Sequence, residues 1–299
     1  MWKDDYLLGD ALIDEQHKGL FDATLTLLDS LKTAESREDY KKYLGDSLAF
    51  VKSYALKHFS DEEEYARSIG FPGAEEHKKI HDKLVQDVLR FEKELVDSDF
   101  ANPVVKRFLG FLITWLTYHV AGEDQKIRKD AAIQAAAPDG AFTGIENLFA
   151  GFADNARDVL KIMTGMKDSD INNQMKSNIH ANPDVCFKVG LVGDVHKAVG
   201  YIYSKEIAFG AFKAMTGMEV SEINEIIYSA LQELSNIFTS KLSSAIAGKG
   251  MFCDIETPSR VDILPVAENR FSMLTPIGNM EIILIENDAP PPTGRYWSK

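Results

Sequence analysis

Along the first 130 residues, apolar side chains recur at intervals of three and four, the spacing that places them on one face of an α-helix. In the first such segment the pattern is carried by Leu20, Leu27, Leu28 and Leu31. The periodicity predicts four helices, at residues 14–33, 38–67, 73–97 and 102–129. The connectors between them are short and contain glycine and proline, as expected between neighbouring antiparallel helices. We therefore expect an all-α, antiparallel four-helix bundle.

Beyond about residue 130 the pattern alternates between the helical period and the two-residue period of β-strands. Helices are predicted at residues 143–164, 204–216 and 222–247, and strands within 184–203 and at 251–263, 270–275 and 279–286. The longest of these helices should begin after Ser221, a good N-cap residue, and stop at Gly248. This mixture of elements predicts an α+β domain.

A short repeat occurs in this second part. Residues 160–166, Leu-Lys-Ile-Met-Thr-Gly-Met, recur at 212–218 as Phe-Lys-Ala-Met-Thr-Gly-Met. At both places a helix is expected to end in a left-handed glycine. The repeat has two interpretations: two similar helix ends, or an internally duplicated α/β unit with pseudo-twofold symmetry and two equivalent helices on one sheet.

Length and composition agree with two domains. A chain of 299 residues is long enough for two cores, and 45% hydrophobic with 26% charged residues is ordinary for globular protein. An alanine-rich stretch before Pro138 and Gly140 marks the predicted boundary. The predicted division is a bundle at 1–131, a linker at 132–141, an α+β domain at 142–290 and an extended tail at 291–299.

Charge and targeting signals narrow the classes of partner. The net charge of -13 and the absence of clustered Lys and Arg argue against nucleic acid. The N-terminus lacks an apolar signal-peptide core, and the longest strongly apolar stretch, 108–116, is too short to cross a membrane. Only two cysteines occur, without a C-x-x-C pair. We expect a cytoplasmic protein with no membrane partner.

Five of the seven histidines lie within the first 120 residues. His58 and Glu62 are four residues apart, as are His77 and His81, so each pair projects from one face of a helix about a turn apart. One such pair is often only a local contact. A ligand or a pair of ligands on each of four consecutive helices is different, because it is the arrangement that metal sites in bundle cores require.

Seven imidazole and carboxylate side chains are candidate ligands: His17, His58, Glu62, His77, His81, His119 and Asp124. This number exceeds what one four-coordinate ion needs and suits two five- or six-coordinate irons that share carboxylates. His119 and Asp124 are five residues apart, which in a regular helix turns them about 140° beyond one full turn. We predict a π-bulge between them that brings both side chains inward.

Residues 1–130 resemble bacterial hemerythrin domains. The resemblance rests on four stretches of sequence: Ile13-Asp14-Glu15-Gln16-His17, His58-Phe59 with Asp61-Glu62-Glu63, Gly70-Phe71-Pro72 leading to Glu76-His77-Lys78 and His81, and Trp115-Leu116 leading to His119 and Asp124. The resemblance implies that one iron is bound by His77, His81 and His119, and the other by His17 and His58. It also implies that the carboxylates of Glu62 and Asp124 bridge the two irons.

The same resemblance implies where oxygen binds. The iron with fewer protein ligands keeps an open position, at which O2 is held as a peroxide-level ligand. The surrounding pocket in the family is apolar and dry, and the candidates for it here are Phe59, Trp115 and Val120. Ala66 stands where many relatives carry methionine, a difference that would enlarge this pocket.

Residues 142–290 resemble the CheX-type chemotaxis phosphatases. This resemblance rests on the Met-Thr-Gly repeat, on residues 190–195 (Gly-Leu-Val-Gly-Asp-Val) and on residues 230–237 (Ala-Leu-Gln-Glu-Leu-Ser-Asn-Ile). It implies long helices packed on an antiparallel sheet, and a homodimer. The apolar stripe of the long helix leaves Glu233 and Asn236 together on its polar side. Such a pair is commonplace on a solvated helix face and gains meaning only from the resemblance.

In that family the Glu-x-x-Asn pair enters the active site of a phosphorylated CheY-like receiver. Carried over to this chain, Asn236 would orient a water for in-line attack on the aspartyl phosphate, and Glu233 would pair with the lysine of the receiver. Phosphoryl transfer depends mainly on positioning of the reactants and on neutralisation of the phosphate charge. The Mg2+ of the receiver would supply the charge neutralisation. The sequence has no phosphate-binding loop, nucleophile elbow or dinucleotide-binding glycine pattern to indicate another enzyme class.

Two functional hypotheses follow. The first is an oxygen-, redox- or iron-sensing phosphatase for a CheY-like response regulator, in which the hemerythrin-like domain controls the CheX-like one. The alternative is a non-catalytic protein that binds O2 or handles iron and uses its second domain only for dimerisation or docking. The Glu233 and Asn236 pair favours the phosphatase.

Overall fold

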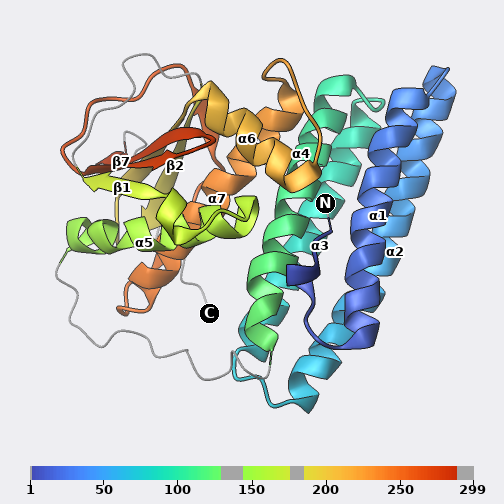
Figure 1. Cartoon of the computed structure of the whole chain (residues 1–299), viewed down its shortest axis with the longest axis horizontal. Helices are drawn as coiled ribbons and strands as arrows, with labels where there is room; N and C mark the ends of the chain where they lie inside the picture. Colours follow the sequence, from blue (N-terminus) through green and yellow to red (C-terminus); the bar gives the residue numbers. More distant parts are fainter. Residues whose placement is uncertain (1, 129–143, 176–184, 288–299) are drawn as a thin grey trace. The chain divides into compact units, whose positions relative to one another are not determined.

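The computed structural model describes residues 2–128, 144–175 and 185–287. The chain divides into two compact units, Met1–Ala136 and Ala137–Lys299. The first unit is helical and the second combines helices with a sheet (Figure 1). The predicted linker at 132–141 and tail at 291–299 lie outside the described residues. Across the described ranges, every helix is too short or too polar to cross a membrane.

The four predicted helices of the first unit are confirmed, as α1 (Ala11–Thr33), α2 (Arg37–Ser68), α3 (Ala74–Asp97) and α4 (Asn102–Tyr118). Capping side chains determine where two of these helices, α1 and α2, begin. Asp10 accepts hydrogen bonds from the backbone N–H groups of Leu12 and Ile13 before α1, and Ser36 accepts one from Asp39 before α2. The regular part of the fourth helix is shorter than predicted: it ends at Tyr118, where η2 (His119–Glu123), a π-helix, and η3 (Asp124–Ile127), a 3-10 helix, follow.

Two apolar clusters form separate levels of the bundle core. One contains Tyr6, Leu20, Phe21, Leu116 and Val120, and the other contains Leu8, Ile13, Ala66 and Ile127. On α1, His17 lies one turn from Ile13 and one turn from Phe21, so it stands between the two levels. The bundle therefore holds a buried polar layer between two apolar layers.

The second unit is built on an antiparallel sheet. Its strands are β1 (Asn172–Met175), β2 (Val185–Gly193), β3 (Lys197–Tyr203), β4 (Cys253–Ile255), β5 (Ser259–Val261), β6 (Arg270–Thr275) and β7 (Gly278–Glu286). They run in the order β1-β6-β7-β3-β2-β4, with β5 also paired to β2. Within the described ranges, all six pairings are antiparallel. The predicted α+β class is confirmed.

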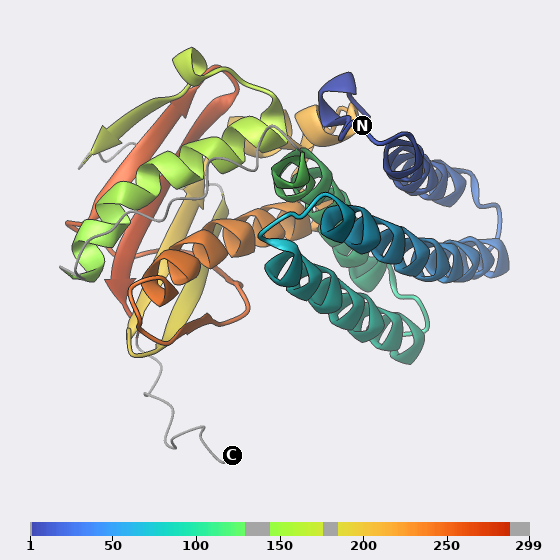
Figure 2. The ribbon, with the colours of Figure 1, turned by 90° about the horizontal axis from the view of Figure 1, so that it is seen from below.

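Helices α5 (Ile145–Thr164) and α7 (Glu225–Ala247) lie on the same face of this sheet (Figure 2). Phe271, Ile282 and Tyr201 form one cross-strand row and so point to one face. Phe271 contacts Phe149 of α5, and Tyr201 stacks on Phe238 of α7. The third helix, α6 (Lys205–Thr216), packs against the turn between β6 and β7.

Three features of this unit differ clearly from the prediction: the start of α7, the strand at 251–263 and an additional strand. Helix α7 begins after Asn224 instead of Ser221, because the Asn224 side chain accepts hydrogen bonds from the N–H groups of Ile226 and Ile227. The strand predicted at 251–263 is two short strands, β4 and β5, with Pro258 between them. Strand β1 was not predicted, because its sequence Asn-Asn-Gln-Met carries no apolar alternation.

The sheet has an order of two related halves, but the two helices that end in Met-Thr-Gly occupy different places, because α5 lies on the sheet face and α6 packs against the turn between β6 and β7. Gly165 and Gly217 end α5 and α6 in the left-handed conformation, with φ of 74° and 75°. Strands β3 and β7 pair at the centre, and β2 and β6 flank them. The outermost strands are β1, the first of the half β1–β3, and β4, the first of the half β4–β7. Each outermost strand pairs with the other half: β1 with β6, and β4 and β5 with β2. The two halves thus exchange equivalent strands.

Two glycines of α5 give opposite expectations on replacement by alanine. Gly165→Ala should lower the free energy of unfolding by about 1 kcal/mol, because φ of 74° is costly for a residue with a Cβ. Gly151→Ala should raise it by about 0.5–1 kcal/mol, because Gly151 is helical and a Cβ there meets no atom within 4 Å. Hydrogen exchange of the α5 amides in the full chain measures both. A shift in the same direction for both variants would contradict this account.

Candidate metal centre

Five histidines and two carboxylates converge between the apolar levels of the bundle. Helices α1 to α3 and the segment after α4 supply them: His17, His58, Glu62, His77, His81, His119 and Asp124. All seven are buried, with at most 4% of each residue exposed. Their ligand atoms form two groups, each within 4.8 Å: the three-histidine group of Glu62, His77, His81, His119 and Asp124, and the two-histidine group of His17, His58 and Glu62.

Glu62 directs its two carboxylate oxygens toward different groups. Its Oε2 atom lies 3.2 Å from Nε2 of His77 and 3.1 Å from Nε2 of His81. Its Oε1 atom lies 3.8 Å from Nε2 of His17, on the other side. A carboxylate in this position is able to bridge two cations.

Asp124 has the same arrangement. Its Oδ1 atom lies 3.0 Å from Nε2 of His119 and 3.4 Å from Nε2 of His77, and its Oδ2 atom lies 3.1 Å from Nε2 of His17. The predicted π-bulge is confirmed, since His119–Glu123 forms one π-helical turn. The wider turn places His119 and Asp124 on the same side of the chain despite their five-residue spacing.

The donor set fits cations. Several buried ring nitrogens and carboxylate oxygens have no hydrogen-bond partner within the described residues: Nδ1 and Nε2 of His17, Nε2 of His58, Nδ1 of His119, Oε1 of Glu62, and Oδ1 and Oδ2 of Asp124. The short distances from Asp124 to His17 and His119 therefore reflect proximity without hydrogen-bond alignment. A buried polar atom left unpaired costs about 1–3 kcal/mol. Mixed imidazole and carboxylate donors suit first-row transition metals such as iron.

Burial and mutual charge shift the pKa values of these groups. Burial lowers the pKa of His58 to about 3. Burial and the charge of Asp124 oppose ionisation of Glu62, but the neighbouring imidazoles of His77 and His81 outweigh them and lower its pKa to about 2. Burial also opposes ionisation of Asp124, but its histidine neighbours, His119 first, hold its pKa well below the usual range. Both carboxylates are therefore anionic at neutral pH and attract cations.

Aromatic rings shield the three-histidine group. Phe59 stacks on His81, with ring centroids 3.9 Å apart and planes at 12°, and Trp115 stacks on His119 at 4.3 Å and 20°. Val120, the third predicted pocket residue, is fully buried in the apolar cluster that includes Phe21 and Leu116. The pocket was predicted around the iron held by two histidines, whereas Phe59 and Trp115 stack on rings of the three-histidine group. Contact of the three side chains with O2 stays a prediction.

Two residues near the cluster were not predicted to have a role. Nδ1 of His58 is 3.1 Å from Oε1 of Gln16, and Nδ1 of His81 is 3.2 Å from Oε1 of Glu63. Gln16 precedes His17 in the sequence and Glu63 follows Glu62. Adjacency to a candidate ligand is the one sequence signal that could have identified them.

The predicted phosphatase pair lies on α7. Glu233 and Asn236 are half-buried, and the Asn236 side chain donates a hydrogen bond of 3.4 Å from Nδ2 to Oε2 of Glu233. The sheet side of α7 is fixed by two buried tyrosines: the Tyr203 hydroxyl is 2.9 Å from Ser235 Oγ, and the Tyr201 hydroxyl is 2.7 Å from Thr239 Oγ1. Asn236 follows Ser235 directly, which turns it about 100° away from this anchored face.

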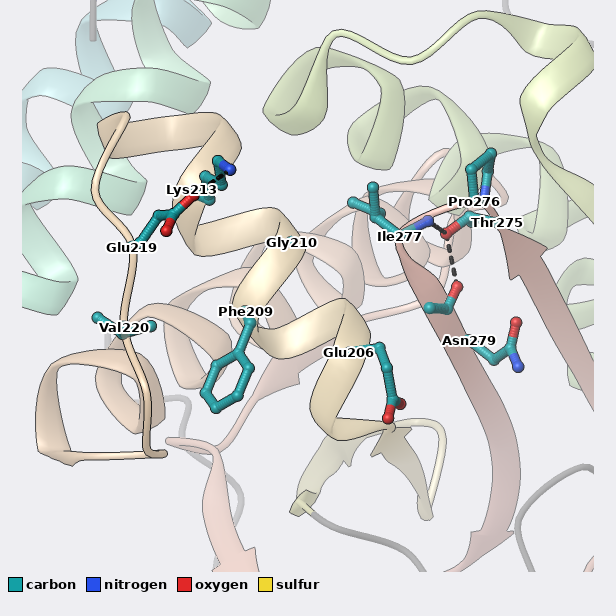
Figure 3. A pocket seen from close by; sticks show the side chains of 11 residues that line it. Glu206, Phe209, Gly210, Lys213, Glu219, Val220, Thr275, Pro276, Ile277 and Asn279 are labelled. Carbon is teal, nitrogen blue, oxygen red and sulfur yellow. Dashed lines mark hydrogen bonds and ion pairs between the residues drawn. The ribbon is translucent and has the colours of Figure 1, made fainter.

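A separate pocket of about 560 Å³ lies between α6, the segment after it and the β6–β7 turn (Figure 3). An ion pair of 2.6 Å between Lys213 and Glu219 stands at one side of it, and Thr275 and Ile277 line the other. Neither Glu233 nor Asn236 lines this pocket, so it is distinct from the predicted phosphatase pair.

Solved structures similar to this chain include chemotaxis proteins. The chemotaxis protein CheX from Vibrio vulnificus aligns over 46% of this chain and 98% of that chain, with 20% identity and a TM-score of 0.41. A chain of the CheX–CheY–BeF3–Mg2+ complex from Borrelia burgdorferi aligns over 47% and 98%, with 19% identity and a TM-score of 0.41.

The bundle itself matches a known family. The family model "Hemerythrin HHE cation binding domain" matches residues 8–129, a range that contains all seven converging side chains. Bacteriohemerythrin from Clostridium acetobutylicum is 32% identical over 126 residues, which are 42% of this chain and 96% of that protein. Through this domain, the chain belongs to the hemerythrin family.

Proposed function

We propose that the buried cluster holds two irons. The three-histidine side chains His77, His81 and His119 would bind one iron, His17 and His58 would bind the other, and Glu62 and Asp124 would bridge them. This proposal rests on the orientation of the two carboxylates. In each of them, one oxygen faces the three-histidine group and the other faces the two-histidine group. When bound, such an iron pair supplies a redox-active centre with a position for O2.

The second unit is proposed to hydrolyse the aspartyl phosphate of a CheY-like response regulator. An amide suits this task, because it both donates and accepts hydrogen bonds and so orients a water without becoming a nucleophile. Since Asn236 Nδ2 donates to Glu233, its carbonyl oxygen remains able to accept from a water. Glu233 would pair with the lysine of the receiver, and the Mg2+ of the receiver would neutralise phosphate charge.

The hydrogen bonds of α7 support this role. Tyr201 and Tyr203 are fully buried and fix the rotation of the helix through Thr239 and Ser235. A rigid helix holds a water-positioning amide more accurately than a loop does, and misplacement by about 1 Å is enough to cost about 100-fold in rate. Packing on β3 therefore sets the rotation of α7.

Control of the phosphatase by the irons completes the proposal. Asp124 belongs to the 3-10 turn that ends the bundle, and the chain continues from Ile127 toward the second unit. A change in charge or bond length at the irons would act on Asp124 directly and so on this last turn. Such a change qualifies as allosteric only when it alters the activity at the other site.

Decay of a phosphorylated CheY-like receiver tests the proposed function. We expect the full chain to accelerate decay, and to do so at different rates in its diferrous form without air and its oxidised form in air. Equal decay with and without the chain in every iron state would leave the alternative, in which the first unit binds O2 or iron and the second only docks or dimerises. Sedimentation of the same preparations tests the homodimer that the resemblance to CheX-type phosphatases implies.

A further inference from the structure

Two of the five histidines in the cluster are hydrogen-bonded on the side that faces away from it. His58 Nδ1 meets the amide oxygen of Gln16 at 3.1 Å, and His81 Nδ1 meets a carboxylate oxygen of Glu63 at 3.2 Å. One of these histidines belongs to the two-histidine group and the other to the three-histidine group. The outer partner is neutral in the first case and a carboxylate in the second.

The orientation of the Gln16 amide follows from its other contact. Its Nε2 atom lies 2.5 Å from Oδ2 of Asp61, which is also paired with Lys57 at 2.7 Å. An ionised carboxylate only accepts hydrogen bonds, so the Gln16 amide must present its N–H to Asp61 and its oxygen to His58. His58 therefore carries its proton on Nδ1 and leaves the Nε2 lone pair to face the cluster.

Glu63 acts in the same way on His81. Its carboxylate accepts from Nδ1, so the Nε2 lone pair of His81 faces inward, where it lies 3.0 Å from Nε2 of His119. A carboxylate acceptor forms a stronger hydrogen bond with an imidazole N–H than a neutral amide does and makes the ring a better electron donor. The two outer contacts are thus similar in geometry and different in electrostatic effect.

We infer that Gln16 and Glu63 are positioning residues that make the two halves of the cluster unequal. Each fixes the tautomer of one histidine, and the carboxylate of Glu63 strengthens binding of a divalent cation by the three-histidine group relative to the two-histidine group. The inference rests on the ligand assignment proposed above and is independent of the phosphatase. It predicts ordered filling, with the three-histidine group first.

Titration of the metal-free full chain with Co2+ under anaerobic conditions tests the inference. We expect two binding steps, distinguishable by calorimetry and by the visible absorption of Co2+. Glu63→Gln should weaken the tighter step about tenfold or more and leave the weaker step unchanged, while Gln16→Leu should weaken the weaker step by a similar factor. In the NMR spectrum of the Co2+-loaded chain, the exchangeable Nδ1 protons of the bound histidines should be shifted by the paramagnetic ion. Glu63→Gln should change the signal of His81 alone, and Gln16→Leu that of His58 alone.

Neighbouring glutamates provide matched controls. Glu64 and Glu15 are exposed and adjoin Glu63 and Gln16 in the sequence, so Glu64→Gln and Glu15→Gln make similar changes away from the cluster. Both controls should titrate like the unchanged chain. Equal weakening of both steps in Glu63→Gln and Gln16→Leu, or no change in either, would overturn the inference while leaving the cluster as a metal site. An unchanged chain that binds no Co2+ would overturn the ligand assignment itself.

Discussion

Replacement of Asn236 by alanine is expected to lower the rate of receiver dephosphorylation at least about 100-fold, the size of effect that follows when a reacting group loses its alignment. The alanine side chain offers no amide to orient the attacking water. Asn236 is half-buried, and its side chain hydrogen-bonds to Glu233 of the same helix, so the fold should persist. Decay of the phosphorylated receiver, followed with each variant at equal concentration, measures the effect.

Two further variants separate chemistry from folding. Asn236→Asp keeps the shape of the side chain but replaces the amide N–H by a second oxygen, and it places two carboxylates beside each other at Glu233. It should therefore be as inactive as the alanine variant. Ser244→Ala changes an exposed residue two turns further along α7 and should retain full activity. Retained hydrolysis in Asn236→Ala would remove Asn236 from the proposed mechanism, whatever the fate of the iron cluster.

The helices of the bundle could be predicted because their burial follows the sequence period. The end of the fourth helix is the instructive case. A regular helix cannot bring His119 and Asp124 together at a spacing of five, and that conflict alone predicted the π-helix that the structure contains. The boundary of the regular helix at Tyr118 was nevertheless missed, because the apolar pattern continues through Val120 to Ile127.

What the sequence did not reveal depends on contacts between distant segments. Gln16 and His58 are 42 residues apart, and Glu63 and His81 are 18 apart, so no local period connects either pair. Strand β1 has a polar sequence and exists because it pairs with β6 across the sheet. The start of α7 was misplaced by three residues because both Ser221 and Asn224 are good N-caps, and packing decides between them.

Replacement of the bridging Glu62 by glutamine is expected to abolish the iron pair. Glutamine keeps the volume of the side chain, but its amide nitrogen cannot serve as a ligand to the second group in place of a carboxylate oxygen. We expect metal analysis of iron-grown protein to fall from two irons per chain to one or none. Glu64→Gln, an exposed change two residues away, should retain both irons.

Loss of the irons should also lower stability and remove the proposed control. A ligand present at about 1,000 times its dissociation constant stabilises the folded state by about 4 kcal/mol, so Glu62→Gln should unfold at a lower temperature than the iron-loaded chain. If the irons control the phosphatase, this variant should dephosphorylate the receiver at one rate with and without air, whereas the unchanged chain should show two. A Glu62→Gln variant that keeps two irons would contradict the bridging assignment. If the variant instead loses its irons but still responds to air, the signal must arise outside this cluster.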